Sequence, residues 1–166
     1  MNLELKILGV IPARGGSKSI YRKNIKLMHG KPLIYYSIEH AKQSKYINRC
    51  ILTTDDSEIR EIGIQLGVEA PFLRPKNISQ DNSTDLEFFQ HLLEWLNINE
   101  PEYIPDILVL LRPTYPTRNV KIIDDCIYTY LNSKDCDCVR TVAKYEGKTP
   151  FKMYRINNSG KQIILN

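Results

Sequence analysis

Long hydrophobic runs are missing from this 166-residue sequence. The longest, 107–111, is far too short to span a bilayer. The first ten residues carry Glu4 and Lys6 inside an apolar stretch, which is not typical of a secretory signal. The apolar content of 42% and the charged content of 25% are ordinary for a globular protein. These features predict a soluble, cytoplasmic protein with one domain over residues 1–166.

Patterns for metal binding and for covalent catalysis are also missing. The sequence has four cysteines without a C-x-x-C pair and three scattered histidines. The cysteines are Cys50, Cys126, Cys136 and Cys138. We therefore predict reduced thiols in or near the core and no metal ligands in this chain. No Ser-His-Asp or Cys-His set stands out, which argues against a nucleophilic enzyme.

Acidic residues are absent from one long segment, 14–31, although the sequence has 19 of them. The same segment carries six cations: Arg14, Lys18, Arg22, Lys23, Lys26 and Lys31. Such segregation is unfavourable in a folded loop unless an anion compensates it, and the net charge of +4 also suits an anionic ligand. The segment matches neither the P-loop pattern nor G-x-G-x-x-G.

Apolar strands alternate with amphipathic helices along the chain, which predicts an α/β three-layer fold with a mostly parallel sheet. The expected strands are 3–13, 49–54, 68–73, 106–111 and 137–143, and the expected helices are 32–44, 57–66, 85–96 and 120–131. A hairpin is expected over 151–165, turning at 157–160. In such sheets ligands bind beyond the carboxyl ends of the strands, so the loops of interest are 14–31, 55–56, 74–84 and 112–118.

Three of these elements carry more detailed predictions. The strand at 106–111 is the most apolar and is expected to be buried. Thr84 and Glu87 have the spacing of a capping box at the start of the 85–96 helix. That helix is expected to bury a stripe of four residues, with Trp95, Phe88 and Phe89 also packed in the core. The stripe consists of Leu86, Phe89, Leu93 and Leu96.

The loop after the first strand is the best candidate for chemistry. Gly15 and Gly16 are adjacent, so successive backbone N–H groups could turn toward one point and form an anion nest. Ser17 adds a hydroxyl donor, and Arg14 and Lys18 flank the glycines with charge. A triphosphate is the ligand that best suits this loop.

Several motifs in order resemble the acylneuraminate cytidylyltransferases, the family of CMP-sialic acid and CMP-nonulosonic acid synthetases. The first reads IPARGGSK over 11–18, and it is followed by KNI at 23–25 and GKPLI at 30–34. Later motifs are TDDSEI at 54–59, PFLRP at 71–75 and LRPT at 111–114. The first motif is highly specific, and the shared order of the others supports it.

The resemblance implies a Rossmann-like three-layer sandwich of the nucleotide-diphospho-sugar transferase type. It also implies a reaction in cell-surface polysaccharide or lipopolysaccharide biosynthesis: CTP and an acidic nine-carbon sugar give CMP-sugar and pyrophosphate. By analogy, Arg14, Lys18 and Lys23 are the catalytic residues. The implied nucleotide-binding residues are Ala13, Arg14, Gly15, Gly16, Ser17, Lys18, Lys23, Asn24 and Arg74, and the implied sugar-binding residues are Arg112, Thr114, Tyr115 and Arg118.

Two differences from the family pattern refine these expectations. Arg112 stands where the family usually has glutamine, and an arginine there could hold a carboxylate bidentately or fit a different acyl sugar. Family members also continue into a dimerisation segment and a region that supplies the aspartates for Mg²⁺. We therefore expect this chain to lack the C-terminal part, the full-length protein to be a homodimer and the Mg²⁺ ligands to lie outside this segment.

Other functions stay open at this point. The same chemistry could use another nucleotide or a sugar phosphate acceptor. The chain could instead bind nucleotide without turnover or offer a basic surface to RNA, although only Tyr21 interleaves the cations of 14–31 where RNA binding favours several aromatics. We expect no nucleic acid and no membrane among the partners.

Overall fold

A central strand, β1 (Ile7–Pro12), organises the molecule. The computed structural model describes residues 5–134, 136–142, 154–156 and 162–164. Parallel to β1 lie β4 (Arg49–Thr53) on one side and β5 (Ile107–Leu110) on the other, in the order β4-β1-β5. The predicted parallel sheet is therefore confirmed, and the carboxyl ends of its strands meet at one edge.

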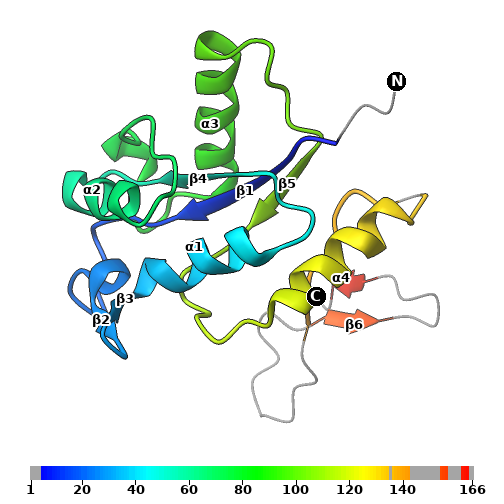
Figure 1. Ribbon diagram of the computed structural model, residues 1–166, viewed down its shortest axis with the longest axis horizontal. Helices are drawn as coiled ribbons and strands as arrows, with labels where there is room; N and C mark the ends of the chain where they lie inside the picture. Colours follow the sequence, from blue (N-terminus) through cyan, green and yellow to red (C-terminus); the bar gives the residue numbers. More distant parts are fainter. Residues whose placement is uncertain (1–4, 135, 143–153, 157–161, 165–166) are drawn as a thin grey trace.

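Helices cover both faces of this sheet, which confirms the predicted three-layer α/β fold. Side chains alternate along β1, so Ile7 and Ile11 pack into one cluster while Leu8 and Val10 pack into another. The first cluster takes in α1 (Leu33–Gln43), α2 (Ser57–Gln65) and α4 (Val120–Leu131), and the second takes in α3 (Asp85–Asn99). Figure 1 shows α1 and α3 on opposite sides of the strands.

The ends of the helices follow the expected local chemistry. Asp56 caps α2 by accepting from the backbone N–H of Ile59 at 3.0 Å, and Gly67 with φ 79° ends that helix. At the start of α3, the Glu87 carboxylate accepts from the backbone N–H of Thr84 and the Thr84 side chain accepts from the backbone N–H of Glu87, as the capping box predicts. None of the helices in the described residues has the length and apolar character to cross a bilayer.

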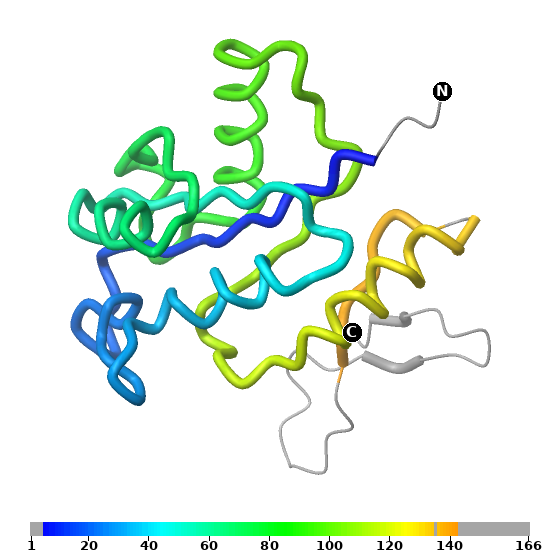
Figure 2. The backbone as a smooth tube through the Cα atoms, viewed as in Figure 1, coloured from blue at the N-terminus to red at the C-terminus, as the bar shows by residue number. Residues whose placement is uncertain are grey.

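Short elements complete the chain. They are η1 (Lys23–Ile25), β2 (Leu27–Met28), β3 (Lys31–Pro32), η2 (Lys76–Ile78), β6 (Tyr154–Ile156) and β7 (Gln162–Ile164). The β2–β3 hairpin turns at His29 and Gly30, whose φ values of 48° and 74° match a type I′ turn. β6 and β7 pair antiparallel, as expected for the last hairpin, while its predicted turn lies outside the described residues. Figure 2 traces the chain through these segments.

Two predicted strands do not form as expected. Residues 68–73 make a single bridge, from Glu69 to Ile51, because Pro71 has no N–H for a continuing ladder. Residues 137–142 form no strand, and position 143 lies outside the described residues.

Burial also departs from the prediction in two elements. The strand expected to be most buried, β5, lies at the edge of the sheet, so all four of its residues are half-buried. In α3 the buried stripe is Phe88, Leu92 and Leu96, while Leu86 and Leu93 are exposed. Phe89 and Trp95 pack beside that stripe as expected. The spacing of the predicted stripe was right for a helix, but the sheet contacts the neighbouring face.

Candidate functional site

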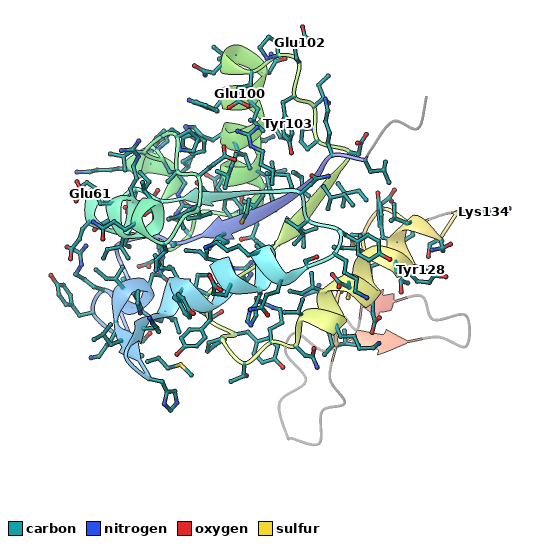
Figure 3. The ribbon with its side chains drawn as sticks, in the orientation of Figure 1. Glu61, Glu100, Glu102, Tyr103, Tyr128 and Lys134 are labelled. Atoms are coloured by element: carbon teal, nitrogen blue, oxygen red, sulfur yellow. The ribbon has the colours of Figure 1, made fainter. Side chains whose placement is uncertain are left out.

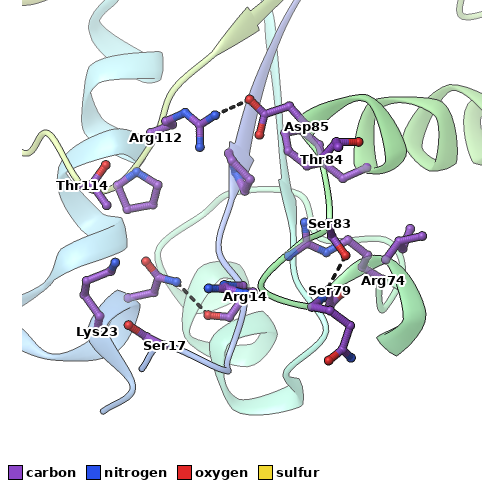
Figure 4. A pocket seen from close by; sticks show the side chains of 16 residues that line it. Arg14, Ser17, Lys23, Arg74, Ser79, Ser83, Thr84, Asp85, Arg112 and Thr114 are labelled. Atoms are coloured by element: carbon purple, nitrogen blue, oxygen red, sulfur yellow. Dashed lines mark hydrogen bonds and ion pairs between the residues drawn. The ribbon is translucent and has the colours of Figure 1, made fainter. Parts of the chain in front are cut away.

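A pocket of about 250 Å³ opens at the carboxyl ends of β1 and β5, beside the start of α3. Four cationic side chains from three of the loops selected from the sequence line it: Arg14 and Lys23 from 14–31, Arg74 from 74–84 and Arg112 from 112–118. Ser17, Asn24 and Thr114 line it as well, so seven of the residues expected from the sequence come together here. Figure 4 shows Arg14 and Lys23 on one side of the pocket and Arg112 with Thr114 on another.

The loop after β1 is fixed at its backbone. Asn24 is buried and donates its side-chain N–H to the backbone carbonyl of Arg14 at 2.9 Å. The backbone N–H of Gly15 donates to Asp55 Oδ1, also at 2.9 Å. The loop is therefore held from both sides in a position that keeps the Arg14 and Ser17 side chains in the pocket lining.

The predicted anion nest does not form. A nest needs successive N–H groups that point to one ligand, but the Gly15 N–H is already engaged by Asp55. Neither Gly15 nor Gly16 has a positive φ. Gly15 is required by close packing instead, because a Cβ there would lie 2.7 Å from Asp56 Oδ2. Gly15, the exposed Gly16 and the fully buried Ala13 do not line the pocket.

Arg74 is the most deeply buried cation of the site, with 6% of its surface exposed. Its Nε has no hydrogen-bond partner, and its guanidinium lies 5.6 Å from the centre of the Phe88 ring. Burial lowers the pKa of Arg74 from its usual value, while the nearby Asp55 carboxylate acts in the opposite direction. A buried guanidinium with an unsatisfied N–H, in the wall of a pocket, is suited to a polar ligand that accepts hydrogen bonds.

Arg112 enters the pocket from the loop after β5. Its guanidinium is ion-paired with Asp85, the first residue of α3, and both side chains are partly exposed. Figure 4 shows this pair across the upper part of the pocket. Because the pair is partly exposed, a ligand carboxylate can replace Asp85 as the partner of the Arg112 guanidinium.

The last two sugar-loop candidates lie away from the pocket lining. Arg118 Nη2 donates to the carbonyl of Arg112 at 2.9 Å, and its guanidinium lies 5.6 Å from the centre of the Tyr115 ring. Its Nη1 approaches His40 Nδ1 of α1 at 3.4 Å. Arg118 therefore braces the loop that presents Arg112, and Tyr115 remains largely exposed beside it.

Protein carboxylates neutralise part of the acid-free segment. Arg22 pairs with Asp56 at 2.7 Å and with Glu58 at 2.9 Å. Arg14 pairs with Asp81 at 2.7 Å, and Lys18 pairs with the same carboxylate outside the pocket lining. Asp81 and Asp85 were not among the site residues predicted from the sequence, although both lie in or next to the 74–84 loop, which was.

The described residues do not by themselves provide a set of ligands for a metal ion. They contain no group of three or more His, Cys, Asp or Glu side chains that could hold an ion. The carboxylates around the pocket are already engaged, Asp81 and Asp85 by cations and Asp55 by a backbone N–H. These residues by themselves do not fit a divalent cation.

Known proteins resemble this chain in sequence. The pseudaminic acid cytidylyltransferase of Campylobacter jejuni is 39% identical over 130 residues, which cover 78% of this chain and 55% of that protein. The N-acylneuraminate cytidylyltransferase of Escherichia coli is 32% identical over 142 residues, which cover 86% of this chain and 32% of that protein. The chain thus spans about half, or less, of the length of these relatives.

The fold is shared with solved structures as well. A CMP:2-keto-3-deoxy-manno-octonic acid synthetase complexed with CTP superposes with a TM-score of 0.62 at 23% identity, covering 76% of this chain and 48% of that one. The family model described as Cytidylyltransferase matches residues 8–155. Because that match takes in both the segments that line the pocket and the strands that position them, the chain belongs to the cytidylyltransferase family.

Proposed function

We propose that this chain carries the nucleotide-binding part of an enzyme that transfers CMP from CTP to a nonulosonic acid and releases pyrophosphate. The observation that carries the proposal is the convergence of Arg14, Lys23, Arg74 and Arg112 on one pocket at the carboxyl ends of the strands. Such a cluster favours an anionic ligand, and family membership makes a cytidine nucleotide the first choice.

In the proposed reaction the anomeric hydroxyl oxygen of the sugar forms a bond to the α-phosphorus of CTP. The bond from that phosphorus to the oxygen shared with the β-phosphate breaks, pyrophosphate leaves, and the hydroxyl proton is released. Catalysis of this kind depends mainly on positioning and on neutralising charge. We assign the triphosphate to Arg14 and Lys23, with Ser17 and Lys18 beside them.

The positions of Asn24 and Arg74 indicate how each would contribute to nucleotide binding. Asn24 donates to the Arg14 carbonyl and so holds the loop after β1 (residues 13–18), which we call the phosphate loop. Its contribution is to orient Arg14. Arg74 lies over the Phe88 ring and shares the pocket wall with Ser79 and Ser83. Its unsatisfied Nε suits the acceptor atoms of a base or ribose.

We assign the acidic sugar to the loop after β5, with Arg112 on its carboxylate and Thr114 beside it. Pseudaminic acid is the first acceptor to test, because the C. jejuni pseudaminic acid enzyme is 39% identical to this chain and the E. coli N-acylneuraminate enzyme 32%. Tyr115 and Arg118 support this loop from outside the pocket.

Nucleotide binding tests the proposal on this chain directly. Calorimetry with CTP, UTP, ATP and a random RNA oligonucleotide, at low and at high salt, separates the candidate functions. We expect CTP to bind more tightly than UTP or ATP. A chain that binds the oligonucleotide with a steep salt dependence and shows no preference for CTP would contradict the proposal.

A turnover assay tests which sugar accepts the CMP group. In a form of the enzyme that turns over, pyrophosphate release is measured with CTP and Mg²⁺, the cation that the resemblance implies, and with pseudaminic, legionaminic or N-acetylneuraminic acid. We expect release to depend on a nonulosonic acid and to be fastest with pseudaminic acid. Equal release with a sugar phosphate would favour a different acceptor class.

A further inference from the structure

The Asp81 carboxylate bridges two cations of the phosphate loop. Its Oδ1 lies 2.7 Å from Arg14 Nη2, and its Oδ2 contacts Lys18 Nζ. Arg14 lines the pocket, whereas Lys18 and Asp81 are not part of its lining and 81% of the Lys18 side chain is exposed. Asp81 itself is 41% exposed, so it holds its two partners in contact with solvent.

The backbone that carries Asp81 is held by its own hydrogen bonds. The Gln80 N–H donates to Ser83 Oγ at 3.0 Å, and the Gln80 side chain donates to the carbonyl of Lys76 at 2.6 Å. The Ser79 hydroxyl donates to the carbonyl of Pro75 at 2.9 Å. These bonds do not involve Asp81, so its carboxylate can leave Arg14 and Lys18 by side-chain rotation alone.

A carboxylate and a phosphate present the same acceptor oxygens to a guanidinium or an ammonium group. The hydrogen bond from Lys18 lowers the pKa of Asp81, with Arg14 acting in the same direction, so Asp81 is ionised at neutral pH. A phosphate that approaches Arg14 and Lys18 therefore meets a position that is already filled by an anion of the protein.

We propose that Asp81 is an internal counter-ion that the phosphates of the ligand must displace, and that it lowers the affinity of the pocket for phosphate-bearing ligands. This inference rests on the proposed function, since that function assigns the triphosphate to Arg14 and Lys23 with Lys18 beside them. When the binding-competent form is only a fraction of the population, the apparent affinity falls by that fraction. A ligand without phosphate does not need the exchange, so Asp81 acts selectively on phosphate-bearing ligands.

The closing experiment compares Asp81→Asn with the unaltered chain. Asparagine keeps the size and an acceptor oxygen but removes the charge. Calorimetry gives the dissociation constants of pyrophosphate, CTP and cytidine for each protein. We expect pyrophosphate and CTP to bind roughly three- to fivefold more tightly to Asp81→Asn, the upper part of the range for partly exposed ion pairs. Cytidine affinity should stay the same.

Glu58→Gln is the matched control. Glu58 pairs with Arg22 of the same basic segment and is 59% exposed, but neither residue lines the pocket. This substitution removes one negative charge near the loop without freeing a pocket cation. We expect it to change pyrophosphate affinity by less than about twofold, in keeping with an exposed pair. An equal gain in both variants would show a general charge effect and overturn the proposal.

The remaining outcomes distinguish a failure of the counter-ion role of Asp81 from a failure of the proposed nucleotide site. If the unaltered chain binds pyrophosphate and CTP, and Asp81→Asn binds them equally or more weakly, the counter-ion role is wrong while the nucleotide site stands. Weaker binding would show that Asp81 instead aligns Arg14 and Lys18 for the ligand. If neither ligand binds to any of the variants, the proposed nucleotide site and the counter-ion role are both wrong.

Discussion

Lys18 and Lys23 are five residues apart in the same basic segment, yet their surroundings differ. Lys23 begins η1 and lines the pocket, whereas Lys18 is not part of the lining and pairs with Asp81. A charge-assisted contact is stronger where solvent is partly excluded than at an exposed position. Residues with the same sequence-based assignment are therefore expected to differ in their effect on nucleotide affinity.

We predict that Lys23→Met weakens CTP binding by about 1.5–3 kcal/mol, the range of one hydrogen bond to a charged group. Lys18→Met should weaken it by about 1 kcal/mol or less, because Lys18 is exposed and already paired. Lys26→Met is the control, since Lys26 is exposed and absent from the pocket lining. Calorimetry measures all three, and a larger loss for Lys18→Met than for Lys23→Met would reverse the assignment.

Arg112 provides the second residue-scale prediction. Its exchangeable pair with Asp85 leaves a guanidinium facing the pocket on the wall opposite the phosphate loop. We predict that Arg112→Gln, in a form of the enzyme that turns over, changes which nonulosonic acid is preferred and changes the KM for CTP by less than about threefold, since a planar bidentate group is lost only on the sugar side. A tenfold rise in the KM for CTP with unchanged sugar preference would move Arg112 to the nucleotide side.

At the scale of an element, the loop after β1 is shaped by what packs beneath it. Asp55 and Asp56, from the end of β4 and the cap of α2, hold the Gly15 backbone and leave no room for a side chain there. Gly16 differs, because a Cβ built on it meets nothing within 4 Å. The two adjacent glycines therefore have different reasons to be present.

We predict that Gly15→Ala lowers the free energy of unfolding by about 1–3 kcal/mol, as overpacking does, and weakens CTP binding because the loop shifts. Gly16→Ala should leave both quantities nearly unchanged. Thermal denaturation and calorimetry on the two variants check this. Comparable losses in both would mean that the flexibility of the loop, and not its packing against Asp56, is what matters.

An ion-pair network at the other end of the sheet joins β4 to the end of α3. Arg49 pairs with Glu69 and with Glu100, both at 2.6 Å, and its guanidinium lies 4.4 Å from the centre of the Tyr103 ring. Figure 3 labels Glu100 and Tyr103 at this end of α3. Hydrogen bonding from Arg49 lowers the pKa of Glu100, so the folded state binds fewer protons at this site than the unfolded chain.

The sign of the pH effect follows from that direction. The contribution of Glu100 to stability is fully present above the ordinary glutamate pKa of about 4.3 and is lost as the pH falls through the lower value in the folded protein. We predict that Glu100→Gln reduces the free energy of unfolding by about 1 kcal/mol at pH 7 and has a smaller effect near pH 3. Urea denaturation at both pH values tests this. Asp125→Asn, in the exposed pair with Lys121, should have little effect at either pH.

Helix bounds and caps could be predicted from the sequence, because residues close together in the chain determine them. The bounds of α4, the capping box of α3 and the Asp56 cap were all predicted in this way. The order of the strands is not a local property, so the edge position of β5 could not be predicted from its apolar composition. The position of Asp81 depends on how the 79–84 turn is placed against β1, which the spacing of residues does not specify.

At the scale of the whole molecule, the pocket joins segments that are far apart in the sequence. Its lining runs from Pro12 to Thr114 and includes the loops after β1 and β5 and the start of α3. Both hydrophobic clusters support these segments from opposite faces of the sheet. A ligand in the pocket therefore contacts all of these segments at once. Because global unfolding separates them, ligand binding should raise the free energy of unfolding of the whole domain.

We predict that CTP raises the thermal unfolding midpoint by about 5–10 °C when its concentration is a hundred times the dissociation constant. That ligand excess adds about 2.7 kcal/mol to the stability of the folded state. A domain of this size gains roughly 2–4 °C for each kcal/mol. If that CTP concentration is set at low salt and then held fixed, the shift should shrink as salt is added, because the pocket presents four cations to the ligand and salt screens their attraction. Cytidine, at the same multiple of its own dissociation constant, should give a similar shift that does not depend on salt. A CTP shift that is insensitive to salt would mean that the phosphates do not reach Arg14 and Lys23, and that the nucleotide is held mainly through its base and ribose by the Arg74 wall.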